Sequence, residues 1–101
     1  MKVISLLTYE NVKCEEGLKK YYEFLEKDGP YFTERRKKFN VKLSSWGDGT
    51  GRMFWMDEFQ SYEDYAKYVD DEEFQKRMIR FSRLVNNAEV KVLRESIMAP
   101  P

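Results

Sequence analysis

Apolar side chains occur on both faces of two predicted strands, residues 2–9 (KVISLLTY) and residues 52–59 (RMFWMDEF). In the first strand, Val3, Leu7 and Tyr9 lie on one face and Ile4 and Leu6 on the other. In the second strand, one face carries Met53, Trp55 and Phe59 and the other carries Phe54 and Met56. Such strands need cover on both sides, so both are predicted to lie in the middle of a sheet.

Amphipathic spacing predicts two helical regions. The first begins after Asn11, acting as N-cap, and ends or bends sharply at Asp28-Gly29-Pro30, with a second short helix over residues 31–38. The other region begins at Ser61, where a Ser-x-x-acid sequence has the form of a capping box. The pair Asp70-Asp71 is expected to interrupt this second region.

Two further strands of mixed polarity are predicted over residues 41–46 and 89–98. The glycine-rich residues 47–51 join the first of them to the strand at 52–59 and form a hairpin turn. This loop lacks the Gly-Lys-Ser/Thr sequence of a phosphate-binding loop. The last three residues, 99–101, are predicted to be extended or disordered.

The order strand, helix, strand, strand, helix, strand predicts one ferredoxin-like α+β domain over residues 1–101. Right-handed crossovers place the two apolar strands at the centre of a four-stranded antiparallel sheet, with both helices on one face. The other sheet face then exposes an apolar patch larger than monomers usually carry. A second copy of the chain is the simplest cover, so we expect a homodimer formed through the open sheet face.

Composition excludes several classes of site. The chain has no histidine and a single cysteine, which removes histidine-based metal and haem sites, internal disulfides and Ser-His or Cys-His catalytic pairs. Cys14 lies on the apolar stripe of the first helix and is predicted to be buried. The net charge is zero, which favours neither nucleic acid nor a membrane surface as partner. No signal peptide or membrane span is evident, so we expect a cytoplasmic protein. Because the chain has no histidine and only one cysteine, we also expect no bound cofactor or metal.

Several short segments of the predicted elements are similar to those of a known superfamily. They are Leu7-Thr8-Tyr9 on the first strand, Asp28-Gly29-Pro30 at the helix bend, Phe54-Trp55, Phe74 and Leu84. With the order of elements, they make the chain resemble the dimeric α+β barrel superfamily, particularly its NIPSNAP-like and EthD-like groups. This superfamily includes cofactor-free monooxygenases, isomerases, sugar mutarotases and haem enzymes, so the fold does not determine the function. Several families of this superfamily have a histidine just before the helix-bend proline, or use one as base or haem ligand. This chain has no histidine, which disfavours the haem and mutarotase activities.

The resemblance implies a ligand cleft between sheet and helices. The polar candidates for lining it are Tyr9, Asp28, Arg36, Trp46, Trp55, and Asp57 or Glu58. Asp28 is the predicted general base, because apolar surroundings raise the pKa of a carboxyl group, and Tyr9 is the predicted hydrogen-bond donor to substrate. Arg36, Trp46 and Trp55 are the predicted substrate-binding residues, with the guanidinium holding an anionic group.

Structural roles compete with each of these assignments. Asp28 precedes a Gly-Pro turn, where aspartate is a common local acceptor, and Arg36 lies in a basic run typical of a solvated helix face. Tyr9 and the tryptophans are also ordinary core or interface residues.

Three functions therefore remain open. The protein binds a small apolar or aromatic molecule and transforms it without cofactor, or it is a non-catalytic structural or interaction dimer, or it is an RNA-recognition-like module. The last is disfavoured, because residues 50–57 match the RNA-binding pattern only at Gly51 and Phe54 and the net charge is zero. A cavity of a few hundred Å³ lined by Tyr9, Asp28 or Trp55 would distinguish the first function from the second.

Overall fold

The computed structural model describes residues 1–96, which form one four-stranded sheet and three helices. In chain order the elements are β1 (Val3–Asn11), α1 (Glu15–Lys38), β2 (Lys42–Gly47), β3 (Arg52–Phe59), α2 (Tyr62–Val69), α3 (Glu72–Ser82) and β4 (Val85–Arg94). The predicted end of the last strand, residues 97–98, and the predicted tail, residues 99–101, lie outside the described residues.

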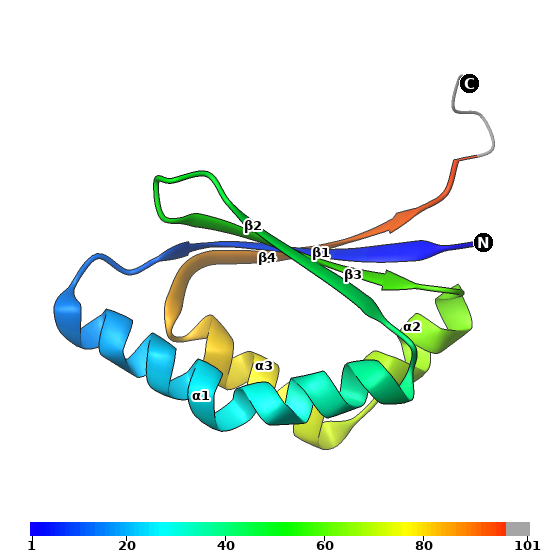
Figure 1. Ribbon diagram of the computed structural model, residues 1–101, viewed down its shortest axis with the longest axis horizontal. Helices are drawn as coiled ribbons and strands as arrows, with labels where there is room; N and C mark the ends of the chain where they lie inside the picture. The colour runs from blue at the N-terminus through cyan, green and yellow to red at the C-terminus, as the bar shows by residue number, and fades with distance from the viewer. Residues whose placement is uncertain (97–101) are drawn as a thin grey trace.

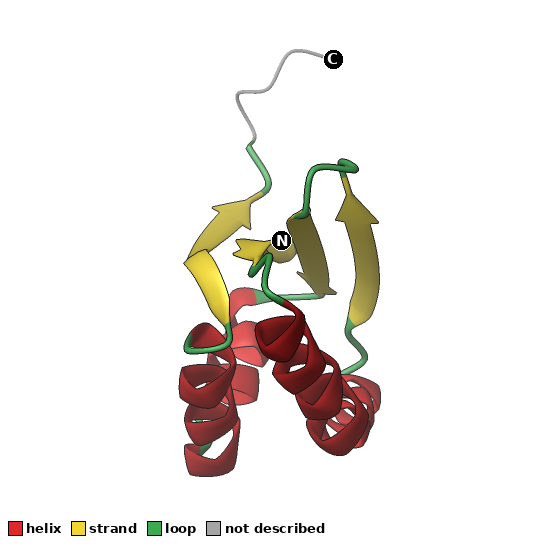
Figure 2. Cartoon of the chain, turned by 90° about the vertical axis from the view of Figure 1, so that its left-hand side faces the viewer, coloured by secondary structure: helices red, strands yellow, loops and turns green. Residues whose placement is uncertain are grey.

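The sheet is antiparallel throughout, with the strand order β2-β3-β1-β4. All three helices lie on one side of it, so the domain has two layers (Figures 1 and 2). The predicted ferredoxin-like α+β fold is confirmed, and the two strands with apolar side chains on both faces are its central strands. Their register pairs Leu6 with Met56 and Leu7 with Trp55. One pair therefore faces away from the helices and the next faces toward them.

The core beneath the sheet is divided into two clusters. The buried residues of the first are Tyr9, Tyr21, Phe24, Phe81 and Val85, and those of the second are Val3, Phe59 and Tyr68. The first cluster joins α1 and α3 to the sheet, whereas the second joins α2 to the opposite ends of β1 and β3. Because the clusters are separate, the middle of the helix-facing side of the sheet is less tightly covered.

The first helix differs from the prediction. α1 is one continuous helix of 24 residues that contains Pro30, so the separate helix predicted over residues 31–38 is wrong. Gly29 does not adopt the positive φ of a C-terminal glycine, and Phe24 and Phe32 pack into the same cluster on either side of the proline. These contacts keep the two halves in one helix, and its ribbon bends near the middle (Figure 1).

The start of α1 was also predicted wrongly. Asn11 is the last residue of β1, where its N–H donates to the carbonyl of Gly51 at 2.9 Å, and it is not a helix cap. The N-cap is Cys14, which makes no capping hydrogen bond through its side chain and is exposed rather than buried. Pairing with the neighbouring strands extends β1 beyond the point at which the sequence pattern ends.

The second helical region agrees with the capping signals. The Ser61 hydroxyl accepts a hydrogen bond from the N–H of Asp64 at 3.1 Å, as the capping box predicts. After the interruption at 70–71, the Asp71 carboxylate caps α3 by accepting from the N–H of Phe74 at 2.9 Å. β4 begins at Val85, earlier than predicted, and accommodates Asn87 at a φ of 53°.

Candidate functional site

A cleft lies between the helix layer and the sheet. It consists of two adjoining cavities of about 260 and 250 Å³ that share part of their lining. The shared lining residues are Leu7, Phe32, Arg36, Trp55 and Met78. The first cavity adds mainly apolar side chains from α1 and α3, whereas the second adds Ser5, Asp57, Tyr65 and Tyr68. The cleft therefore has an apolar part and a part with a polar end.

The polar end contains an ion pair between α1 and β3. Arg36 Nε donates to Asp57 Oδ1 at 3.0 Å, and Nη2 donates to Oδ2 at 3.3 Å, in a two-pronged arrangement. Asp57 lies two residues after Trp55, so strand alternation directs both side chains toward the helices. Burial raises the pKa of the Asp57 carboxyl group above its ordinary value, although the charge of Arg36 opposes this effect. The carboxylate is thus both held in place and made more basic.

Tyr68 supplies a hydrogen-bonding group with no protein partner. This residue of α2 is 2% exposed, and its hydroxyl is buried without a hydrogen bond to any described atom. Burial raises the pKa of the Tyr68 phenol to about 12, so the hydroxyl stays protonated and can donate near neutral pH. Tyr68 is not among the candidates predicted from the sequence, although its position three residues after Tyr65 places it on the same helix face.

Trp55 separates the cleft from Tyr9. The Trp55 Nε1 donates to the Tyr9 hydroxyl at 2.8 Å, and that hydroxyl shares a hydrogen bond of 2.5 Å with Tyr21. Tyr9 is 1% exposed and is not among the described residues that line the cleft. Burial, reinforced by Tyr21, raises the pKa of Tyr9 far above its ordinary value. The structure therefore places Tyr9 behind Trp55.

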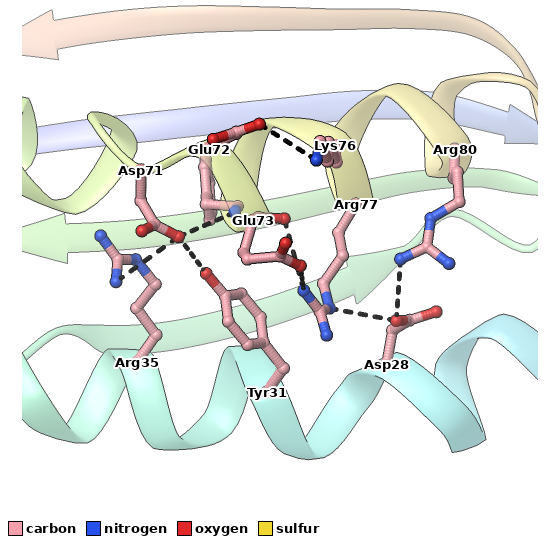
Figure 3. Close-up of polar contacts among 10 residues, drawn as sticks. Asp28, Tyr31, Arg35, Asp71, Glu72, Glu73, Lys76, Arg77 and Arg80 are labelled. Carbon is pink, nitrogen blue, oxygen red and sulfur yellow. Dashed lines mark hydrogen bonds and ion pairs between the residues drawn. The ribbon is translucent and has the colours of Figure 1, made fainter.

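Asp28 holds two helices together (Figure 3). Its buried carboxylate accepts from Arg77 Nε at 3.1 Å and from Arg80 Nη2 at 3.3 Å, which joins α1 to α3. Arg77 also stacks over the ring of Tyr31 at 4.0 Å, and the Tyr31 hydroxyl donates to Asp71 at 2.5 Å. Asp28 is not among the described lining residues, and its Oδ1 atom accepts from both arginines.

Trp46 lies away from the cleft. It pairs with Phe54 across β2 and β3 and therefore belongs to the sheet face opposite the helices, where it is 63% exposed. Glu58 lies on the same open face. Of the residues singled out from the sequence, the structure thus brings together Arg36, Trp55 and Asp57.

Neither a metal site nor a membrane-spanning helix is found in residues 1–96. No group of three or more cysteine or acidic side chains in this part of the chain could hold a metal ion. None of its helices combines the length and the apolar composition needed to cross a bilayer.

The high pKa of Tyr68 predicts a loss of stability in alkaline solution. Between its ordinary pKa of 10.0 and the folded value of about 12, the folded chain keeps a proton that the unfolded chain releases. The free energy of unfolding should therefore fall with rising pH, by up to about 1.4 kcal/mol per pH unit from this group. In urea denaturation at a series of alkaline pH values, Tyr68→Phe should show a shallower fall than the parent. Equal slopes would contradict the assignment.

Comparison with known proteins identifies the fold and leaves the function open. No protein-family model matches the sequence, and no curated protein is significantly similar to it. Among solved structures, Rv0793 from Mycobacterium tuberculosis is similar with a TM-score of 0.72 and 11% identity, over 99% of this chain and 100% of the other. A putative antibiotic biosynthesis monooxygenase from Deinococcus radiodurans has a TM-score of 0.71 and 11% identity, over 98% and 97%.

A NIPSNAP family protein from Agrobacterium tumefaciens is also similar, with a TM-score of 0.61 and 14% identity, over 97% of this chain and 89% of the other. These structures share the fold of this chain, and one of them is a NIPSNAP family protein, which agrees at the level of the fold with the resemblance predicted from the sequence. Identities this low carry no further information about activity. The resemblance to the EthD-like group stays a prediction.

Proposed function

We propose that this protein is a homodimer in which each subunit binds a small apolar or aromatic molecule in its cleft and transforms it without a cofactor. The observation that carries the proposal is the polar end of the cleft. There Tyr68, whose buried hydroxyl has no hydrogen-bond partner among the described residues, lines the same cavity as the Arg36–Asp57 pair. A cleft packed solid would have favoured the alternative of a non-catalytic dimer; the two cavities favour ligand binding.

The chemistry that suits this arrangement is removal of a proton from the carbon atom next to a carbonyl group of the ligand. A planar ligand would lie against the ring of Trp55, with its oxygen accepting a hydrogen bond from the Tyr68 hydroxyl. The Asp57 carboxylate, positioned by Arg36, would take a proton from the ligand, and Tyr68 would stabilise the negative charge left on the oxygen. The resulting enolate is the intermediate of an isomerase, and it is electron-rich enough to react with dioxygen as in a monooxygenase. The name of the Deinococcus protein is consistent with the latter.

The catalytic roles predicted for Asp28 and Tyr9 accordingly pass to Asp57 and Tyr68 in this proposal. Asp28 is bound by two arginines outside the cleft lining, and Tyr9 accepts the indole N–H of Trp55. Arg36 would act on the carboxylate rather than directly on an anionic ligand, because both oxygens of Asp57 accept from it.

Binding and proton removal can be tested with α-tetralone, a planar aryl ketone with exchangeable hydrogens beside its carbonyl. In a Trp46→Phe background, Trp55 is the sole tryptophan, and we expect saturable quenching of its fluorescence. Tyr68→Phe should weaken binding about tenfold, the value of one hydrogen bond to a carbonyl. Asp57→Asn should abolish catalysed exchange of those hydrogens in D₂O, followed by NMR. The matched control is Tyr62→Phe, an exposed tyrosine outside the cleft.

The outcomes separate the alternatives. Saturable quenching with no catalysed exchange would favour a binding protein without catalytic activity. Absence of any saturable quenching by α-tetralone and by other neutral aryl ketones of similar size would contradict the proposal.

The open sheet face supports the homodimer. Its central strands present Ile4, Leu6, Phe54 and Met56, and its edge strands add the exposed side chains of Trp46 and Leu93. Apolar side chains from all four strands thus lie on one uncovered face, which favours a partner there. The charges around it are mixed, for example Lys91 paired with Glu89 at 3.7 Å, so two copies would not repel each other. Sheet-to-sheet packing about a two-fold axis would cover the patch on both subunits.

The same mixed charges argue against the RNA-binding alternative. Glu58 and Glu89 lie on the face that would meet the nucleic acid, beside Lys42 and Lys91. This face therefore offers no net positive field to a phosphate backbone, which is the main source of affinity in such modules.

A further inference from the structure

Gly29 lines the apolar cavity of about 260 Å³ from the middle of α1. Leu25, four residues before it, and Phe32 and Arg36, three and seven residues after it, line the same cavity. These spacings place all four positions on one face of the helix. Among the described residues that line this cavity, Gly29 alone has no side chain. The cavity is therefore open at the one position of this helix face where a side chain is missing.

Neither the backbone conformation nor close packing requires glycine at this position. The φ of Gly29 is not positive, and α1 continues to Lys38, so Gly29 does not end the helix. A Cβ atom at position 29 would meet no described atom within 4 Å outside its chain neighbours and the adjoining helix backbone. At Gly17 of the same helix, by contrast, a Cβ atom would lie 2.5 Å from Cγ2 of Val12. Position 29 thus has room for a side chain, although it carries a residue that is unfavourable inside helices.

Pro30 gives Gly29 one local role. A proline ring crowds the Cβ atom of the preceding residue when that residue is helical, and a glycine relieves this crowding. Pro30 itself is exposed and is not among the described residues that line the cavity. A Pro30→Ala background therefore removes the local effect and leaves the effect of Gly29 on the cavity.

We propose that Gly29 keeps the apolar cavity open and so determines how long an apolar group the cleft accepts. This inference rests on the proposed ligand binding. A ligand whose carbonyl oxygen reaches Tyr68 would extend past Trp55, which lines both cavities, and place its apolar end beside Gly29. The ligand class is then a neutral aryl ketone with an apolar substituent on the ring, away from the carbonyl. Because Gly29 does not line the second cavity, a larger residue there would exclude the substituent and leave the polar end intact.

The length dependence can be tested with 4′-methylacetophenone and 4′-butylacetophenone, which differ by three methylene groups. In a Trp46→Phe, Pro30→Ala background, binding is followed by quenching of Trp55 fluorescence. We expect the affinity to rise about fourfold for each added methylene, the gain from burying it. Gly29→Leu should weaken binding of the butyl ketone about tenfold or more, and should change binding of the methyl ketone by less than about twofold.

Two further variants complete the comparison. Gly29→Ala adds a single methyl group where there is room for it, so it should fold at least as stably and weaken binding of the butyl ketone about fourfold. The matched control Lys27→Leu adds a leucine about 200° around the helix at an exposed position, and should alter neither affinity. Equal affinities of the background for the two ketones, or an unchanged preference for the butyl ketone in folded Gly29→Leu or Gly29→Ala, would overturn the role of Gly29 and leave the proposed ligand binding in place.

Xenon distinguishes a failure of this inference from a failure of the proposed function. Xenon binds apolar cavities without a polar partner, and Leu25 lines the first cavity but not the second. Xenon should shift the Leu25 methyl signals of the background chain in NMR spectra, and this shift should be lost in Gly29→Leu. If neither ketone gave saturable quenching, the proposed function would be wrong, whereas loss of the xenon shift in Gly29→Leu would still support the role of Gly29. An equal xenon shift in both chains would overturn that role.

Discussion

Replacing Met56 with lysine should convert the proposed homodimer into a folded monomer. Met56 lies at the centre of the open sheet face, opposite Leu6 on the neighbouring strand. A lysine there would bury an unpaired charge in the interface, at a cost of about 2 kcal/mol or more per substituted side chain. Because a two-fold interface carries the substitution twice, the dissociation constant should rise about a thousandfold. Light scattering at micromolar concentration measures the change from twice the chain mass to the chain mass.

The matched control is Ile79→Lys, which introduces the same charge at an apolar side chain that is 53% exposed on α3, on the helix side of the domain. It should leave the dimer intact. A monomeric parent protein would contradict the dimer, and a dimeric Met56→Lys variant would contradict the assignment of the open sheet face as its interface.

Replacing Asp28 with alanine should destabilise the protein while leaving the chemistry proposed for the cleft in place. The substitution leaves Arg77 without its buried carboxylate partner and breaks the link between α1 and α3. Loss of one partner of a buried ion pair costs about 3 kcal/mol, the lower end of the usual range, because Arg77 keeps Glu73 and Arg80 is half exposed. Urea denaturation gives this difference directly.

Glu73→Ala serves as control, because it removes the exposed partner of Arg77 and should cost less than about 1 kcal/mol. α-Tetralone exchange distinguishes the two roles considered for Asp28. If Asp28→Ala kept its stability but lost exchange, Asp28 would be the base predicted from the sequence, and the role proposed for Asp57 would be wrong.

Much of the fold could be predicted because it follows from local patterns. In a strand, successive side chains point to opposite faces, so the apolar positions show which faces are buried. Residues 2–9 and 52–59 have apolar side chains on both faces, and both strands lie at the centre of the sheet as predicted. The capping sequence at Ser61 and the acidic interruption at 70–71 depend on neighbouring residues alone, and both were predicted correctly. Pro30 shows the limit of local rules, since core packing on both sides of it keeps α1 continuous.

The site was less predictable because it depends on contacts between distant segments. Arg35 and Arg36 are neighbours in one basic run, yet Arg35 Nε donates to the carbonyl of Tyr68 and Arg36 binds Asp57. Only the packing of α1 against the sheet and α2 decides between these partners. Asp28 likewise meets its arginines from α3, which local turn preferences around Gly29-Pro30 could not reveal.

The central claim, that the helix-facing side of the sheet binds ligand and the open side binds a second copy, can be tested by methionine methyl NMR. Met78 lines both cavities, whereas Met56 lies on the open face. Titration of the ¹³C-methyl-labelled protein with α-tetralone should shift the Met78 signal in a saturable manner and leave the Met56 signal unchanged. A shift confined to Met56, or no saturable shift at Met78, would contradict the account.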